Sequence, residues 1–315
     1  MKNALLILIM FCTIACSESK EVRGNNNVPQ HNDTINIMSF NMWHGGDAGG
    51  QALTKSIEVI RAARGGIVGV QESGGYGNPR PDRSAEMAGN MGWRQVNQGH
   101  LDGIMTKYQI TEVLESRKGV KIKLDDDKYI WFFNCHLAYI PYQPYQLANK
   151  EYGDYPFIST EEEAIQWAAD TRLHQLEAYI AEIDKVKKEG WPVVLTGDFN
   201  EPSHLDWTQR AADANVVQQK VQWPCTKRLF DYGFKDAFRA ANPDEVKRPG
   251  KTWSSIESPG EIHDRIDFIF VMGDQLKLLK SQTVGEPTLK SDIHVVDYPS
   301  DHRAVVASFK WVDAE

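Results

Sequence analysis

Four apolar runs of strand length occur along the chain, and each ends at a polar residue. They are Ile35 to Asn41, Ile67 to Glu72, Trp131 to His136, and Val193 to Asp198. Their length and their β-branched and aromatic content predict buried strands. A polar group at the end of such a run would cost free energy if it were buried without a partner. These polar residues are therefore candidates for pairing or ligand binding.

Helical spacing appears between the strand-like runs. The segment Thr54 to Arg64 is expected to form a helix, and Thr160 and Glu163 have the spacing of a capping box. Apolar residues then recur at intervals of three and four, which predicts one buried helix face. They are Ile165, Ala169, Leu173, Leu176, Ile180 and Ile183. Lys121 to Leu124 and Tyr129 to Leu137 are predicted to form a hairpin. This alternation favours an α/β core of two sheets with helices outside.

The end of the Val193 run carries the clearest chemical signal. Asp198 and Asn200 stand two residues apart, so in extended geometry they point the same way. A carboxylate and an amide facing one spot can bind a hard cation, a water molecule and a phosphate oxygen. Asp, Asn, Gly and Pro are also common turn residues, so the segment alone leaves an ordinary turn open.

Two C-terminal segments add to the pattern, Arg265 to Phe270 and Tyr298 to Val305. Together with the four runs, in this order, they resemble the endonuclease/exonuclease/phosphatase superfamily, which includes deoxyribonuclease I, exonuclease III, neutral sphingomyelinases and inositol polyphosphate 5-phosphatases. The resemblance covers about Thr34 to Trp311. It implies a four-layer α/β/β/α sandwich of the deoxyribonuclease I type, with two mixed sheets whose strand ends meet at one cleft.

The resemblance also implies roles for individual residues. Glu72 would be the principal metal ligand, aided by Asn41 and Asp301, and such oxygen ligands favour Mg²⁺ or Mn²⁺ over zinc. Asp198 and Asn200 would orient the attacking water or the leaving group and hold the phosphate.

The remaining catalytic roles fall to two histidines. His302 matches the catalytic histidine of the family and Asp267 its carboxylate partner, while His136 would donate to a non-bridging phosphate oxygen. Whether the histidine or the aspartate activates water stays open.

A tyrosine-rich segment from Tyr139 to Phe157 follows the His136 strand. Tyr142 and Tyr145 within it are predicted to contact the substrate, since such rings stack on a sugar, a base or a lipid headgroup. A packed loop is the alternative. For His204, as for His44 and Trp207, substrate contact and plain loop structure are equally compatible with the sequence.

The first residues resemble a bacterial lipoprotein signal. Residues 1–15 have a short basic start and a brief apolar core, and Cys16 would become the lipidated N-terminus. Residues 16–33 are polar and predict a disordered tether, which leaves residues 34–315 as the catalytic domain. We therefore expect a protein of the cell envelope held to a membrane by a lipid anchor, with simple secretion as the second choice. Cys135 and Cys225 are expected to be buried and unpaired.

The charge balance bears on the substrate. The 315 residues carry a net charge of −8, and removal of residues 1–15 would make it −9. Avid nucleic-acid binders usually carry a basic stripe, so no stable nucleic-acid complex is expected. The sequence predicts a monomeric, exported, divalent-metal-dependent phosphoesterase acting on a small or lipid-linked phosphate ester. The alternative is a surface nuclease. A binding protein without catalysis is disfavoured because every polar residue of the motifs is present.

Overall fold

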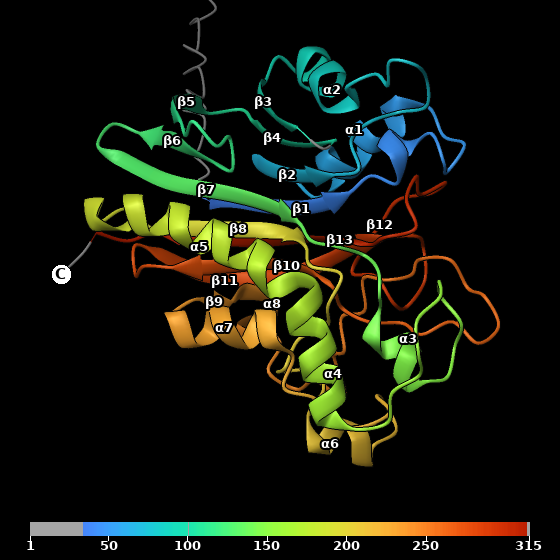
Figure 1. The fold of residues 1–315 in the computed structure, drawn as a ribbon. Helices are drawn as coiled ribbons and strands as arrows, with labels where there is room; N and C mark the ends of the chain where they lie inside the picture. The colour runs from blue at the N-terminus through green and yellow to red at the C-terminus, as the bar shows by residue number, and fades with distance from the viewer. Residues whose placement is uncertain (1–33, 100, 314–315) are drawn as a thin grey trace, which may run out of the picture. The chain divides into compact units, whose positions relative to one another are not determined.

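The structure is a computed structural model, and it describes residues 34–99 and 101–313. Two sheets form the core (Figure 1). The first has the order β12-β11-β13-β1-β2-β4-β3, with strands β1 (Thr34–Asn41), β2 (Ile67–Gln71), β3 (Arg94–Gly99), β4 (Asp102–Thr106), β11 (Leu276–Gly285), β12 (Ile293–His294) and β13 (Ala304–Trp311). The second has the order β5-β6-β7-β8-β10-β9, with strands β5 (Gln109–Val113), β6 (Gly119–Asp125), β7 (Lys128–His136), β8 (Val193–Asp198), β9 (Lys235–Asp236) and β10 (Asp267–Met272).

Helices flank the sheets. Those described are α1 (Leu53–Ala62), α2 (Arg83–Met91), α3 (Gln143–Leu147), α4 (Glu161–Ala168), α5 (His174–Val186), α6 (Gln209–Asp213), α7 (Pro224–Tyr232) and α8 (Ala237–Ala241), with the short 3₁₀ helices η1 (His44–Gly46) and η3 (Lys187–Glu189) and the π-helical segment η2 (Ala169–Leu173). Among the described residues, no helix is both long enough and apolar enough to cross a membrane.

The alternation of side chains along β7 explains the layers. Trp131 and Phe133 pack with residues of α5 and α7 on the outer face of the second sheet, whereas Ile130 and Phe132 pack between the two sheets. Helices α1 and α2 cover the outer face of the first sheet in the same way (Figure 1). The predicted four-layer α/β/β/α sandwich is confirmed.

Several local predictions are also confirmed. The hairpin is β6 and β7, and the capping box of Thr160 and Glu163 is present at the start of α4. Cys135 and Cys225 are buried and unpaired. The predicted signal peptide, the lipidation at Cys16 and the tether at residues 16–33 lie outside the described residues.

The predicted face of the long helix is partly wrong. Before α5 the fully buried residues are Ala164, Ala168 and Arg172, whereas Ile165, Ala169 and Leu173 are partly buried. The π-helical segment η2 joins α4 to α5, and the wider turn of a π segment shifts which residues face the core. The buried guanidinium of Arg172 is compensated by hydrogen bonds to the segment after β7, which simple apolar periodicity does not anticipate.

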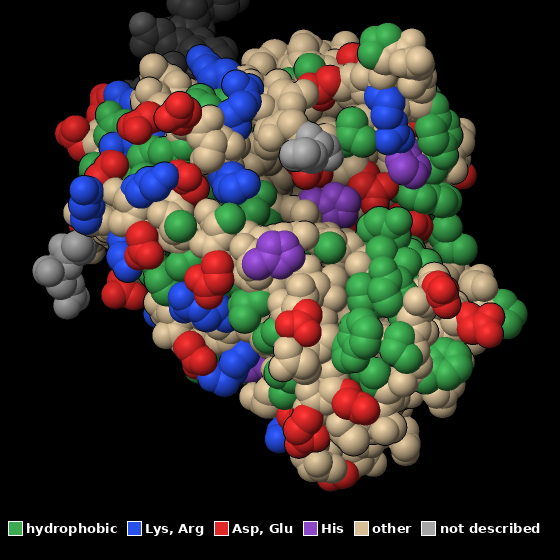
Figure 2. Space-filling view, viewed as in Figure 1, with side chains coloured by type: hydrophobic (Ala, Val, Ile, Leu, Met, Phe, Trp, Pro, Cys, Tyr) green, Lys and Arg blue, Asp and Glu red, His purple; other side chains and the backbone are tan. Residues whose placement is uncertain are grey.

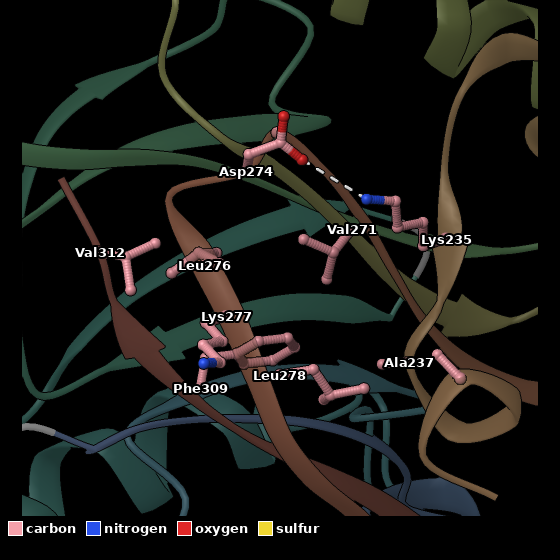
Figure 3. Close-up of a pocket in the computed structure, with 11 residues that line it drawn as sticks. Lys235, Ala237, Val271, Asp274, Leu276, Lys277, Leu278, Phe309 and Val312 are labelled. Atoms are coloured by element: carbon pink, nitrogen blue, oxygen red, sulfur yellow. Dashed lines mark hydrogen bonds and ion pairs between the residues drawn. The ribbon is translucent and has the colours of Figure 1, made fainter. Parts of the chain in front are cut away.

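A cavity of about 300 Å³ opens where β10 and β11 meet (Figure 3). Its lining is mainly apolar, with Leu276 and Phe309 among the contributors, and Lys235 lies 3.4 Å from Asp274 at its rim. It lies near the Met272 end of β10, where Met272 pairs with Val193. Asp267 pairs with Asp198 at the other end of the strand. The motif residues therefore gather elsewhere.

Candidate active site

Strand register brings the polar ends together. In the second sheet His136 pairs with Asp198 across β7 and β8, and Asp198 pairs with Asp267 across β8 and β10. Asn41 ends β1 of the other sheet, and its Nδ2 donates to Asp198 Oδ2 at 2.9 Å. The ends of both sheets thus meet at Asp198, which is almost fully buried.

Two sharp turns redirect side chains after the strands. Glu72 and Asn200 have left-handed backbones, with φ of 51° and 48°. Asparagine visits this region readily, but for glutamate it costs about 1 kcal/mol or more, so the surrounding structure must impose it. Asn41 Nδ2 donates to Glu72 Oε1 at 3.2 Å, and the backbone N–H of His44 donates to Oε2 at 3.3 Å. Glu72 is therefore held with its carboxylate toward the strand ends.

The Asn200 turn fixes both members of the Asp198 and Asn200 pair. The backbone N–H of Asn200 donates to Asp198 Oδ1 at 2.9 Å, and its side-chain amide donates to the carbonyl of Leu137 at 3.1 Å. Asp198 consequently has one oxygen bonded within its own turn and the other bonded to Asn41.

His302 and Asp267 form a buried pair. His302 Nδ1 lies 2.9 Å from Asp267 Oδ2, and Nε2 lies 3.7 Å from Asp198 Oδ2. Burial lowers the pKa of His302, but Asp267 and Asp198 outweigh that effect and raise the pKa well above its usual value. The Trp253 ring packs 4.8 Å from the imidazole, centroid to centroid, and restricts its orientation. Nε2 is therefore the nitrogen that remains for chemistry beside Asp198.

His136 occupies a similar position on the other side of Asp198. Its Nε2 lies 3.7 Å from Asp198 Oδ2, and its Nδ1 lies 3.4 Å from Asp102 Oδ1. Burial lowers the pKa of His136, but Asp102 and Asp198 raise it to about 9. Asp102 Oδ1 also accepts from the backbone N–H of Glu72 at 3.3 Å. Asp102 thus supports both His136 and the strained Glu72 turn.

Asp102 is a functional candidate that the sequence analysis missed. It stands directly before Gly103, at the start of strand β4, and its partner His136 is 34 positions further on. An acidic residue at the start of a strand was the available signal, but nothing local linked it to the motifs.

This pairing yields a prediction about pH. Replacing Asp102 with asparagine should lower the pKa of His136 from about 9, because the nearest acceptor loses its charge. The raised pKa means that His136 stabilises the fold fully below about pH 6.5, and that this contribution is lost as pH rises through about 9. NMR titration of the ring measures the pKa directly, and an unchanged value in Asp102→Asn would contradict the pairing.

Asp301 provides a further buried carboxylate. Its Oδ1 accepts no hydrogen bond from the described residues. Burial raises the pKa of Asp301 to about 6, with the nearby Glu72 adding to the rise and His302 opposing it. An orphaned carboxylate oxygen near Glu72 suits a hard divalent cation, which prefers oxygen ligands. The residues present therefore fit the metal that the motifs imply.

A second grouping also meets the distance requirement for a metal. Ligand atoms of Asp198, Asp267 and His302 lie within 4.8 Å of one another. His302 Nδ1 and Asp267 Oδ2 bond to each other, which leaves His302 Nε2 and Asp267 Oδ1, and the latter has no hydrogen-bond partner among the described residues. The Glu72, Asn41 and Asp301 group offers oxygen ligands alone, which Mg²⁺ and Mn²⁺ prefer over a set that includes an imidazole nitrogen.

A cavity of about 710 Å³ lies at these strand ends. Its lining includes Glu72, His136, Asp198, Asp301 and His302. Figure 2 shows histidine and acidic side chains at a hollow, with a band of hydrophobic side chains running down from it.

The chain matches the sequence model of the endonuclease/exonuclease/phosphatase family over residues 38–302. It belongs to that family. It is 29% identical over 327 residues to the uncharacterized protein F14F9.5 of Caenorhabditis elegans, covering 98% of this chain and 99% of that protein. It is also 29% identical over 161 residues to exodeoxyribonuclease III of Haemophilus influenzae, covering 45% of this chain and 57% of that protein.

Solved structures confirm the fold of this family member. An AP endonuclease from Archaeoglobus fulgidus has a TM-score of 0.54 at 16% identity, covering 87% of this chain and 99% of that one. A family protein from Beutenbergia cavernae has a TM-score of 0.55 at 16% identity, covering 89% and 72%. TDP2 of D. rerio, complexed with a single-strand DNA product, has a TM-score of 0.51 at 15% identity, covering 88% and 98%.

Of the residues considered as substrate contacts, some line the cavity and others do not. Tyr142 and Tyr145 line the cavity, as does His44. His204 lies outside it, nearly buried, with Nδ1 2.9 Å from Thr226 Oγ1 and a pKa lowered to about 4 by burial. Trp207 is buried, and its indole N–H donates to Asp264 at 3.0 Å. The structure therefore gives His204 and Trp207 packing partners in place of a position at the cavity.

Proposed function

We propose that this protein is a divalent-metal-dependent phosphoesterase that hydrolyses a small or lipid-linked phosphate ester by in-line attack of water. One observation carries the proposal. The His302 imidazole, which is held by Asp267, converges on a single cavity with the Asp198 carboxylate and with the Asp301 carboxylate, whose Oδ1 has no partner among the described residues. Membership of the family supports hydrolysis of phosphate esters in general, and the finer statements are our own.

Glu72, Asn41 and Asp301 would hold Mg²⁺ or Mn²⁺. When bound, such an ion neutralises charge on the phosphoryl group and stabilises the charge that develops in the transition state. Without a cation, Glu72, Asp198 and Asp301 would face an anionic substrate with like charge, so the ion would support substrate binding as well as chemistry.

Several side chains would share the proton transfers of the reaction. Asp267 fixes His302 through Nδ1, so that Nε2 is presented beside Asp198. Asp198 and His302 together supply one acceptor for the proton of the attacking water and one donor for the leaving oxygen. His136, held by Asp102, would donate to a non-bridging phosphate oxygen. Asn200 would hold the phosphate beside Asp198.

A substrate panel tests the function. Bis-nitrophenyl phosphate, plasmid DNA, RNA, phospholipids and sugar phosphates would be assayed with Mg²⁺ and with a chelator. We expect hydrolysis of at least one small ester that the chelator abolishes. Absence of metal-dependent turnover on every substrate would reject the proposal and favour a binding protein.

A nuclease is the second candidate, because the chain shares 29% identity over 161 residues with an exodeoxyribonuclease III. The net charge of −8 opposes it, since phosphate contacts supply most non-specific affinity for nucleic acids. Turnover of plasmid or RNA well above that of the small esters, with affinity falling steeply with salt, would establish this alternative.

We also propose that the protein is exported and anchored by an acyl chain on Cys16. The short apolar leader and the Ala15 and Cys16 pair support this. Mass spectrometry of the mature protein should find an N-terminus at Cys16 carrying lipid. A single chain holds a membrane only weakly, so firm membrane association requires multiple acylation. An unmodified Cys16, or a mature N-terminus elsewhere, would contradict the anchor.

A further inference from the structure

His44 lies at the edge of the cavity, beside the proposed metal ligand Glu72. It is one of the residues that line the cavity, and its side chain is 38% exposed. Its backbone N–H donates to Glu72 Oε2 at 3.3 Å, and its Nδ1 lies 3.9 Å from the same oxygen. The imidazole is therefore close enough to contact a group bound to an ion at Glu72.

The backbone at His44 is held in an unfavourable conformation. Trp43 and His44 both have left-handed backbones, with φ of 47° and 55°. Residues of this size rarely adopt that region, so the surrounding structure must impose it at two successive positions. The backbone N–H of Gly45 donates to the carbonyl of Glu72 at 2.7 Å, which ties this turn to the Glu72 turn. Strain of this kind is concentrated where a protein presents a side chain to a ligand.

Arg80 fixes the hydrogen-bonding role of each nitrogen of the His44 ring. Its Nη2 lies 2.8 Å from His44 Nδ1, and its Nε donates to the carbonyl of Gly75 at 3.0 Å. A guanidinium group has donors only, so Nδ1 must accept. An imidazole that accepts through Nδ1 carries its proton on Nε2. Within the described part of the chain, His44 Nε2 has no hydrogen-bond partner of its own.

The charges around this nitrogen favour an anionic oxygen as its ligand. Nε2–H can bind only an acceptor, which excludes ammonium groups. Glu72 and Asp301 carry negative charges, which the divalent ion proposed to lie between them would offset. Arg80 forms no ion pair with a described carboxylate, so its positive charge remains beside the ring. That charge polarises the imidazole and strengthens Nε2–H as a donor.

We propose that His44 is a further substrate-contact residue, whose Nε2–H donates to a phosphoryl oxygen of the ester, and that Arg80 is the positioning residue that fixes this nitrogen as the donor. The inference rests on the proposed function, because the phosphoryl group is taken to lie between the Glu72 ion and Asp198. His44 follows β1 of the first sheet, whereas His136 ends β7 of the second. Two histidines from different sheets then contact the phosphoryl group.

NMR of the full-length protein with nitrogen-15 histidine tests the tautomer. In mildly alkaline buffer, the two ring nitrogens of His44 should show the shifts of the neutral Nε2–H form. Inorganic phosphate added with Mg²⁺ should move the Nε2–H signal. In Arg80→Ala the ring should instead show a mixture of the two neutral tautomers. A wild-type ring protonated on Nδ1 alone, or an Nε2–H signal that phosphate leaves unchanged, would overturn the proposal.

Calorimetry tests the contact itself, with inorganic phosphate as the ligand and Mg²⁺ present. His44→Ala should weaken phosphate binding by roughly 10- to 100-fold, the loss expected for a hydrogen bond to a charged group. His44→Gln should retain part of the affinity, because its amide keeps a donor. Arg80→Ala should weaken binding less, and adding it to His44→Ala should have little further effect, since Arg80 acts through His44.

Two controls separate this contact from other effects. Arg94→Ala removes the same charge from an exposed residue that does not line the cavity, so it should bind phosphate like the wild type. The backbone N–H that holds Glu72 is still present in His44→Ala, so its Mg²⁺ affinity should stay close to that of the wild type. A loss of Mg²⁺ affinity as large as the loss of phosphate affinity would mean that His44 only supports the metal turn, which overturns the contact.

The outcomes also distinguish this inference from the proposed function. Phosphate binding that depends on His44, in a protein that hydrolyses no ester, would keep the contact and reject the catalytic function. Metal-dependent hydrolysis together with unchanged phosphate binding in His44→Ala would keep the function and reject the contact. A fall in Arg94→Ala as large as that in Arg80→Ala would reduce the role of Arg80 to net charge, which overturns its assignment as a positioning residue.

Discussion

Replacing His302 with alanine should slow the hydrolysis of every phosphate ester by roughly 10²- to 10⁴-fold, the usual loss when positioned acid–base help is removed. His302 Nε2 lies 3.7 Å from Asp198, at the end of the strands where the phosphorus is expected. All substrates share that centre, so the loss should be similar for each. The measurement is kcat on two esters with unrelated organic groups.

The control for this variant is His174→Ala, because His174 is exposed on helix α5, away from the cavity. It should retain wild-type turnover. A His302→Ala variant that keeps full activity, or that loses activity on one ester and not on the other, would contradict the catalytic assignment.

A second variant tests how Asp267 acts. Its contact with the site is the bond to His302 Nδ1, so it works through that histidine. Adding Asp267→Asn to His302→Ala should therefore slow the reaction little further, as expected for residues that act as one unit. If the fold reductions in kcat of the two single variants multiply in the double variant, Asp267 has a separate role.

Much of this site could be predicted from local sequence. Buried strands appear in a sequence as short apolar runs. The polar residues at the ends of these runs, Asn41, His136 and Asp198, can therefore be identified without a structure. The cost of burying an unpaired polar group marks those ends as functional. The family resemblance then implied that the strand ends meet at one cleft and that Asp267 is the partner of His302.

The contacts that could not be predicted join distant segments. Asp102 supports His136 from another sheet, and Tyr142 is occupied by Asp264, which is 122 positions away. Which tyrosine is exposed at the cavity depends on such bonds, and all tyrosines of the segment look alike in sequence. Likewise, the buried position of Arg172 depends on carbonyls of the preceding loop, whereas apolar periodicity alone placed Leu173 on that face.

The metal assignment leads to the second large effect. Glu72→Gln should weaken Mg²⁺ binding by about 10- to 100-fold or more, since removal of a group that only supports a metal site already has an effect of that size. The amide keeps the size of the side chain and one acceptor oxygen for the Asn41 bond, so the fold should persist. Turnover should fall with the affinity, and Mn²⁺ in excess should restore part of it, because that ion tolerates an amide ligand better.

Two measurements check this without relying on activity alone. Calorimetry gives the Mg²⁺ affinity, and thermal melts give the stabilisation by the ion, which follows the ratio of its concentration to its dissociation constant. Wild-type Tm should rise with Mg²⁺, and the Tm of Glu72→Gln should rise much less. Glu261→Gln is the matched control, because Glu261 lines the same cavity but pairs with Lys150 at 3.0 Å.

An equal response to Mg²⁺ in wild type and Glu72→Gln would show that Glu72 is not the main ligand. Asp301 would then be the next residue to replace, since it carries the remaining carboxylate of the proposed set and its Oδ1 has no partner among the described residues.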